Sequence, residues 1–257
     1  SKWPGRTAKI TGLTGAVTKL IEHNGNDGTI KLLAYCDDGA TATIYSWTPE
    51  GASASLGTVA TGGEVSHAQF VGLTVIVGNK FVPQKYNGST LGTLAGWPPV
   101  YSTQAVTEIS EDDTAFTLGA NPSLVETHVN RLWLSGDATN PYKVYYSGNF
   151  TPETWTNTGS IERGGWIDIL KNDNKGKITA IVSWQNKLVV FKELAIYFIE
   201  GTGPRSVGAL QPFSISQTIL PVGTNSRHSI IRQGNDLLFF DNNNQWRSLL
   251  NTITNAE

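Results

Sequence analysis

The feature that most constrains this sequence is a repeat in which a Leu-led apolar strand is followed, at a set distance, by an aromatic residue. The strands open at Leu32, Leu73, Leu132, Leu188 and Leu237, and the matching aromatics are Tyr45, Tyr86, Tyr145, Tyr197 and Trp246. By subtraction, the offsets are 13, 13, 13, 9 and 9 residues. Because side chains alternate between the two faces of a strand, an even change of four is predicted to shorten the hairpin loop and keep the aromatic on the same face.

The spacing between the repeats predicts one antiparallel sheet per unit. Successive leading leucines lie 41, 59, 56 and 49 residues apart by subtraction, a period typical of β-propeller blades. An apolar strand also precedes the Leu strand in the last four units, at 65–70, 124–129, 178–184 and 229–232. Each repeat is therefore predicted to be a meander of three strands, with a fourth, outer strand between units. Helix content is expected to be low.

We expect one all-β domain over residues 1–257, namely a β-propeller of five blades, with six blades or a two-sheet sandwich as the alternatives. The segment Thr7 to Ile21 is strand-like and belongs to no complete unit, and the last unit ends near Leu249. Pairing the two ends would remove both exposed strand edges, so the N-terminal segment is predicted to close the ring. Methionine is absent, which is expected of a processed chain or of part of a longer protein.

Composition argues against several classes of protein. With 19 Lys and Arg against 21 Asp and Glu, the chain lacks the positive excess of a strongly basic nucleic-acid binder. The single cysteine, Cys36, excludes an internal disulfide and a Cys-based zinc site, and is predicted to be a small buried hydrophobe. No apolar run is long enough to span a membrane, and the first residues do not read as a secretory signal. We expect no cofactor and no membrane partner.

The histidines and hydroxyl groups do not form a recognisable catalytic motif. His23, His67, His128 and His228 show no metal-ligand spacing, and each is predicted to cap or pack at a strand end. No serine lies in a G-x-S-x-G context. A calcium loop beginning at Asn24 fails because its twelfth position is Tyr35, where a bidentate Glu is needed.

Carboxylates carry the main enzymatic alternative, because glycosidases place two acids about the scissile bond. Asp37 and Asp38 immediately precede Gly39 and are predicted to form a turn, whereas Glu193 is expected at a strand end. Asp168 lies in the apolar stretch GWIDIL and is the hardest to dismiss. The full candidate set is Asp37, Asp38, Glu126, Asp168 and Glu193.

Aromatic side chains carry a second alternative, a carbohydrate-binding surface. The aromatics of the repeat are predicted to pack between sheets. Only Trp3, Trp97 and Trp155, which are flanked by Pro, Thr or Gly, are interpreted as loop aromatics.

From Asn130 onward the sequence resembles tail hub or nozzle proteins of short-tailed bacteriophages, the group that includes packaged-DNA stabilisation and head-to-tail connector proteins. The matching segments are NRLWLSGDATNPYKVYYSGNFTPETW (130–155), GWIDIL (165–170), KITAIVSWQNKLVVFKELAIYFIEG (177–201) and VGTNSRHSIIRQGNDLLFFDNNNQWRSL (222–249). The upstream pieces 28–35 and 68–90 resemble earlier repeats of the same family. These segments are spread along most of the chain, which stops soon after the final repeat, where family members often continue.

The resemblance implies a non-enzymatic structural protein of the virion, assembled in the host cytoplasm. Such a protein forms a homo-oligomeric ring below the portal, contacts portal, adaptor and other tail proteins, and retains and releases the packaged double-stranded DNA. Contacts to the DNA channel are expected at Lys171, Lys175 and Lys177. Interface loops are expected at Trp97, Pro98, Pro99, Glu111, Asp112 and Asp113. The alternative is a carbohydrate-binding or glycosidase-like propeller that recognises a host surface.

Overall fold

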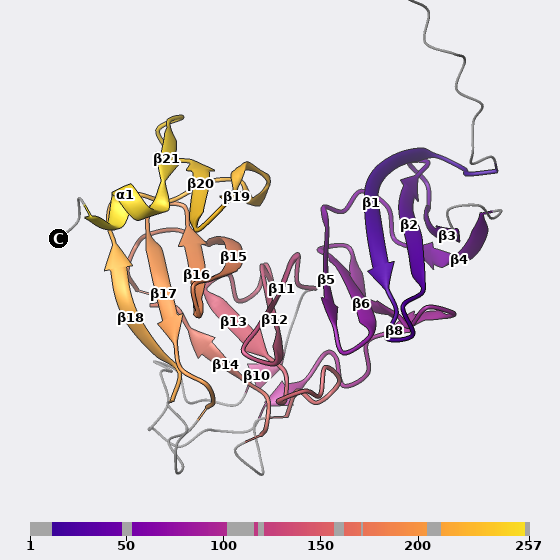
Figure 1. Ribbon diagram of the computed structural model, residues 1–257, viewed down its shortest axis with the longest axis horizontal. Helices are drawn as coiled ribbons and strands as arrows, with labels where there is room; N and C mark the ends of the chain where they lie inside the picture. The colour runs from indigo at the N-terminus through magenta and orange to yellow at the C-terminus, as the bar shows by residue number, and fades with distance from the viewer. Residues whose placement is uncertain are drawn as a thin grey trace, which may run out of the picture.

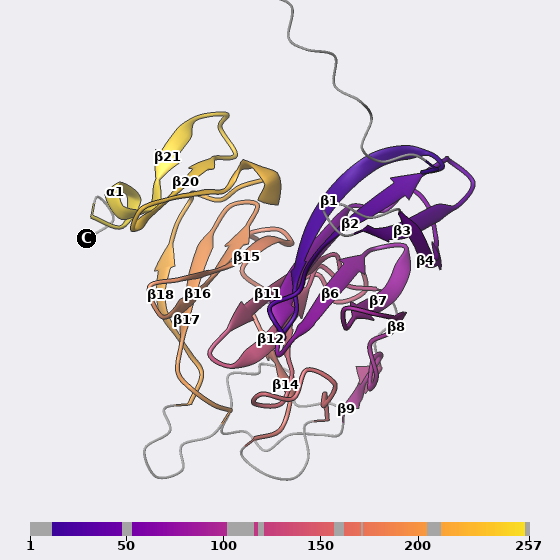
Figure 2. The ribbon, with the colours of Figure 1, turned by 45° about the vertical axis from the view of Figure 1, so that its right-hand side comes forward.

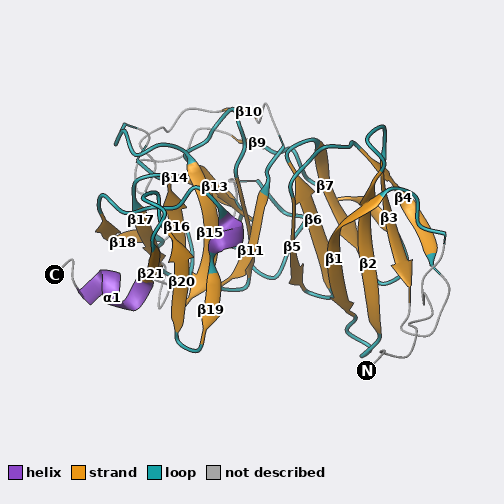
Figure 3. Ribbon diagram, turned by 90° about the horizontal axis from the view of Figure 1, so that it is seen from above, coloured by secondary structure: helices purple, strands orange, loops and turns teal. Residues whose placement is uncertain are grey.

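The computed structural model describes residues 12–47, 53–101, 116–117, 121–156, 162–170, 172–204 and 212–254. Over these residues the chain forms five sheets of antiparallel strands, one small strand pair and very little helix, as Figure 3 shows. The all-β prediction is confirmed.

Each of the first four sheets is a meander of four strands in chain order. The first sheet contains β1 (Ala16–Asn24), β2 (Ile30–Asp37), β3 (Ala42–Trp47) and β4 (Ala54–Val59), and the second contains β5 (Val65–Phe70), β6 (Leu73–Gly78), β7 (Phe81–Tyr86) and β8 (Leu91–Thr93). The third contains β11 (Leu124–His128), β12 (Arg131–Ser135), β13 (Lys143–Tyr146) and β14 (Gly165–Asp168), and the fourth contains β15 (Ile178–Trp184), β16 (Lys187–Lys192), β17 (Ile196–Glu200) and β18 (Ser214–Ile219). The outer fourth strand is therefore present in these four units.

The last sheet is smaller, with three strands among the described residues. It contains β19 (Ile231–Gln233), β20 (Asp236–Phe240) and β21 (Trp246–Ser248), preceded by the short 3-10 helix η1 (Arg227–Ser229) and followed by α1 (Leu249–Thr254). The remaining pair joins β9 (Val100–Tyr101) to β10 (Phe116–Thr117) between the second and third sheets in the sequence.

The five sheets follow one another along an arc, from the indigo first sheet to the yellow last sheet (Figure 1). The first strand of each sheet lies on the inside of this arc. Strand β5 contacts β1 and β11, β11 contacts β15, and β15 contacts η1. The sheets therefore present their first strands to a common centre, with the later strands of each sheet following outward (Figure 2).

Apolar cores lie between successive sheets. One cluster joins sheets one and two through Tyr35 and Phe81, and the next joins sheets two and three through Val75 and Leu134. The others join sheets three and four, and sheets four and five, as in the contact of Phe191 with Phe239, whose ring centroids are 5.3 Å apart. Because each core uses one face from each of two neighbouring sheets, the stack is stabilised by burial between repeats.

The turns between the first and second strands explain why these hairpins are tight. In sheets two, three and four they have two residues, both in the left-handed region, as with Val129 (φ 45°) and Asn130 (φ 56°). Such paired positive φ values match the twist of the flanking strands. Val71 and Val129 adopt this conformation despite their β-branched side chains, which normally disfavour it.

The Leu-aromatic repeat holds only in part. Leu132, Leu188 and Leu237 are fully buried, as are Tyr86, Tyr145 and Tyr197, and Tyr45 is 7% exposed. Leu32 and Leu73 are half-buried. Trp246 is 63% exposed, so the predicted burial of the fifth aromatic is wrong.

Strand register explains these exceptions. Tyr45, Tyr145 and Tyr197 lie opposite the residue two positions after their leading Leu, and therefore share its face. Tyr86 lies opposite Thr74, one position after Leu73, in a sheet with a register shift between Ile76 and Gly78. Trp246 lies opposite Phe240, three positions after Leu237. In these two units the Leu and the aromatic are on opposite faces.

The segment Thr7 to Ile21 was predicted to close the ring by pairing with the last unit. Residues 16–21 instead lie in β1 and pair with β2 of the first sheet. These residues therefore belong to the first repeat. Residues 7–11 lie outside the described residues. No strand pairing joins the first and last sheets within the described ranges.

Candidate functional site

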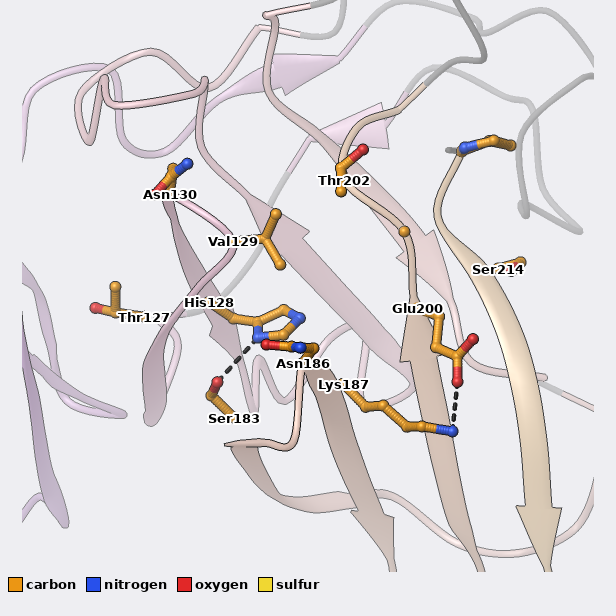
Figure 4. A pocket seen from close by; sticks show the side chains of 12 residues that line it. Thr127, His128, Val129, Asn130, Ser183, Asn186, Lys187, Glu200, Thr202 and Ser214 are labelled. Carbon is orange, nitrogen blue, oxygen red and sulfur yellow. Dashed lines mark hydrogen bonds and ion pairs between the residues drawn. The ribbon is translucent and has the colours of Figure 1, made fainter. Parts of the chain in front are cut away.

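A cavity of about 800 Å³ lies where the third and fourth sheets meet. Figure 4 shows its walls, formed by the β11–β12 turn, the β15–β16 turn and the facing ends of β17 and β18. It is lined by Thr127, His128, Val129, Asn130, Ser183, Asn186, Lys187, Glu200, Gly201, Thr202, Pro212 and Ser214. We call this cavity the groove.

The most unusual group in the groove is the imidazole of His128, at the end of β11. The side chain is 5% exposed, and its Nδ1 atom lies 2.9 Å from Ser183 Oγ. Its Nε2 atom is buried and has no hydrogen-bond partner. Burial lowers the pKa of His128 to about 4, so the ring is neutral at pH 7.

The two charged residues of the groove neutralise each other. Lys187 forms an ion pair with Glu200, drawn as a dashed line in Figure 4. The hydrogen bond from Lys187 lowers the pKa of Glu200, keeping it ionised. The groove therefore offers amide, hydroxyl and imidazole groups without net charge.

A Ser-His contact could suggest a nucleophile and its base, but the same contact recurs elsewhere. His23, near the end of β1, places Nδ1 2.9 Å from Thr74 Oγ1 in the next sheet, and its Nε2 is also buried and unpartnered. Both histidines thus connect successive sheets. We interpret the His128–Ser183 contact as a joint between repeats, in agreement with the predicted packing role.

A second cavity, of about 280 Å³, lies at the centre of the arc. All five sheets or their leading segments line it, through Lys19, Ser66, His67, Val125, Glu126, Ile181, Val182, Arg227, His228, Ile230 and Arg232. Three of these side chains are permanent cations, and one, Glu126, is a carboxylate. We call this space the central cavity.

Charge dominates the central cavity. Burial and then the nearby charges of Lys19 and Arg227 lower the pKa of His67 to about 4. Lys19 has its pKa lowered by burial and by Arg227. Burial raises the pKa of Glu126, whose Oε2 atom lies 4.0 Å from Arg232 Nη2.

The predicted acids occupy separate places. Asp37 accepts hydrogen bonds from Thr61 and from the backbone of Gly39 and Gly62, and Asp38 accepts bonds from the backbone of Ala40 and Thr41. These bonds confirm the turn. Among the predicted acids, only Glu126 lines the central cavity.

Asp168 and Glu193 do not line the central cavity. Asp168 is buried on β14 and lies 3.4 Å from Lys143 Nζ, which is a structural ion pair. Glu193 is in the turn between β16 and β17. The structure does not assemble the glycosidase set.

The predicted DNA contacts are only partly described. Lys177 is exposed and lines a cavity of about 400 Å³ beside the centre, together with Glu64 and Arg227. Lys175 is half-buried, and its backbone N–H donates to Asp173. Lys171 lies outside the described residues.

The predicted interface loop needs correction at Trp97 and Pro99. Trp97 is 7% exposed and packs against Tyr145 and Trp155, with ring centroids 5.6 Å and 5.1 Å away. Pro99 is also buried, whereas Pro98 is exposed. Glu111, Asp112 and Asp113 lie outside the described residues.

Trp155 is also buried, at 1% exposure. Two of the three predicted loop aromatics, Trp97 and Trp155, are therefore not available for a carbohydrate-binding surface. Trp3 falls outside the described ranges. Among the described residues, the large exposed aromatics are Trp246 and Phe150, neither of which was predicted to be exposed. Trp246 was predicted to be buried because it matches the aromatic position of the repeat.

Sequence analysis named His67, Glu126 and His228 but did not predict that they line one cavity. Lys19, His67 and Glu126 lie on first strands, and only their position inside the arc brings them together. The available signal was that four of the five first strands carry a charged or titratable residue, β15 being the exception. Within the described ranges, no group of three His, Cys, Asp or Glu side chains is placed to hold a metal ion.

Comparison with known proteins adds a weak structural likeness. No family model matches the sequence, and no curated protein matches it. Among solved structures, the AfRom2 CNH domain aligns with a TM-score of 0.45 and 9% identity, covering 88% of this chain and 61% of that chain. The protein described here thus spans about three fifths of the length of the solved chain that it matches. No helix in the described residues has the length and apolar character needed to cross a membrane.

Proposed function

We propose that each sheet is one blade of a β-propeller and that the described chain contributes five blades. The support is that first strands from consecutive sheets surround the central cavity and that each apolar core lies between two consecutive sheets. A two-sheet sandwich does not account for five separate sheets. A sixth blade remains the alternative, since Phe240 and Trp246 on the last sheet form an aromatic pair with Trp246 largely exposed.

The function that fits best is that of a structural virion protein in the tail hub or nozzle of a short-tailed bacteriophage. The observation that carries this proposal is the family resemblance of segments spread from residue 28 to residue 249, together with the repeated-sheet architecture that it implies. A stack of sheets that buries its cores between its own repeats is a rigid subunit. Its turns and rims remain available for neighbouring copies and for portal or adaptor proteins.

In this role the chain helps to line or support the channel below the portal, retaining the packaged DNA and releasing it on infection. A lumen through which DNA passes must not bind phosphates tightly, because each neutralised phosphate adds to affinity. The near balance of 19 basic and 21 acidic residues suits this requirement. Lys177, exposed beside the centre, is the described candidate for a transient contact.

Recognition of a host-surface carbohydrate is the second candidate, supported by the groove. Asn130, Asn186 and Thr202 offer neutral hydrogen-bonding groups there (Figure 4), as sugar hydroxyls require. The buried Trp97 and Trp155 do not contribute an exposed stacking surface.

The tail proposal is tested by interrupting the gene in the phage that encodes this chain and supplying the protein from a plasmid. We expect particles without the protein to package DNA and then lose it, so that filled heads fall while empty heads rise, and complementation to restore filled heads. Particles that retain their DNA but no longer adsorb to cells would contradict genome retention and favour surface recognition. The groove double variant Asn130→Ala with Asn186→Ala serves as the matched comparison, and should behave as wild type in both assays.

A further inference from the structure

The central cavity carries a concentration of positive charge that the tail proposal does not use. Lys19, Arg227 and Arg232 enter it from the first sheet, from η1 and from the last sheet, while Glu126 is the one carboxylate among the described residues that line it. Glu126 lies near Arg232, at 4.0 Å. This leaves Lys19 and Arg227 as the cations facing the rest of the space.

Neither of these two cations forms an ion pair with a carboxylate of the described residues. The ammonium group of Lys19 has no hydrogen-bond partner among the described residues. Arg227 donates through Nη1 to the backbone oxygen of Ser123, and its Nε lies 3.5 Å from His228 Nε2. The Nη2 atom of Arg227 is buried and lacks a partner. A buried guanidinium nitrogen without an acceptor is costly, and a bound acceptor would remove this cost.

The surrounding groups indicate what that acceptor is. The pKa of Lys19 is lowered by burial and by Arg227, and the pKa of His67 is lowered to about 4 by burial and by both cations. The nearby Glu64 raises the pKa of Arg227, but burial outweighs this effect. By the residues that line it, the central cavity holds three cationic side chains against one carboxylate.

We propose that the central cavity binds a small tetrahedral oxyanion, phosphate or sulfate, between Lys19 and Arg227. Arginine and lysine provide only donors, and charge-assisted bonds to phosphate oxygens are the strong class of hydrogen bond. A volume of about 280 Å³ accommodates such an ion with water. The ion would tie the first sheet to η1, which leads into the last sheet, where no strand pairing joins these two sheets in the described part of the chain.

Calorimetric titration of the full chain with sodium phosphate, at ionic strength matched with sodium chloride, measures the affinity directly. We expect saturable binding of one ion per chain at about millimolar concentration or below, and weakening of about tenfold or more in Lys19→Gln and Arg227→Gln. The control is Lys80→Gln, since Lys80 is an exposed lysine in the β6–β7 turn, and it should bind as wild type. Sodium sulfate distinguishes the two oxyanions by their relative affinities.

A local readout keeps the test independent of folding defects in the variants. The imidazole resonances of His67 should move on addition of phosphate to the wild-type chain, whereas those of His23, in another cavity, should not. Absence of phosphate binding above the chloride control, or undiminished binding in Lys19→Gln and Arg227→Gln, would overturn the proposal. This site does not depend on the tail assignment, because binding is measured on the isolated chain.

Discussion

Lys143 lies across the strand pair from Asp168, with Nζ 3.4 Å from Oδ2, and both residues are at least 98% buried. Removing the carboxylate should leave a buried ammonium without its charge partner. We expect Asp168→Ala to lower the free energy of unfolding by about 3 to 5 kcal/mol, measured by urea denaturation.

The partly exposed pair Lys187–Glu200 provides the matched control. Glu200→Ala should cost less than about 1 kcal/mol, because solvent screens surface ion pairs. Equal losses in Asp168→Ala and Glu200→Ala would contradict the assignment of Asp168 as a structural ion-pair residue.

Leu188 tests the repeated core. It is fully buried between the third and fourth sheets, and Leu188→Ala should destabilise the protein by about 2 to 5 kcal/mol through lost burial and an unfilled cavity. Leu20, which is 62% exposed, gives the comparison, and Leu20→Ala should change stability by less than about 0.5 kcal/mol. A loss below this value at Leu188 would show that its face is not packed.

Stability should fall in mild acid because of His128. Its pKa is about 4 in the folded chain, against an ordinary value of 6.5. The unfolded chain therefore binds more protons between these values, so unfolding free energy decreases as pH falls from about 6.5 towards 4. His128→Gln should remove up to about 3 kcal/mol of this decrease. Parallel pH profiles for the two proteins, measured by denaturant unfolding, would count against a buried neutral imidazole.

The position of β1 gives a prediction opposite to closure by the N-terminal segment. Because Ala16–Asn24 pairs with β2, deleting residues 1–20 should increase hydrogen exchange most in the first sheet, around Tyr35. Exchange around Leu237 should change less. Greater loss of protection around Leu237 than around Tyr35 would restore the original closure hypothesis.

Much of the fold could be predicted because each repeat is local. Strands 65–70 and 178–184 were predicted at the bounds observed for β5 and β15, since apolar runs and tight turns are encoded by neighbouring residues. The face of the sheet on which the fifth aromatic, Trp246, lies could not be predicted in this way. Whether Trp246 shares a face with Leu237 depends on register, which places it opposite Phe240.

The candidate sites were harder to predict because they are assembled from distant segments. Lys19 and Arg227 are 208 residues apart by subtraction and meet only through the arc of sheets. Trp97 was interpreted as exposed because of the adjacent prolines, but it is held in the core by Tyr145 and Trp155. The prolines beside Trp97 therefore predicted correctly that it lies in a loop, but did not predict that its side chain is buried.

The central claim, that this chain is a tail hub or nozzle subunit, is tested most directly by electron cryomicroscopy of the intact particle that carries it. We predict a symmetric ring of copies on the tail axis below the portal, with each copy fitting the five-sheet arc described above. A single copy on a side spike or fibre tip, away from the channel, would contradict the account and favour recognition of a host-surface carbohydrate.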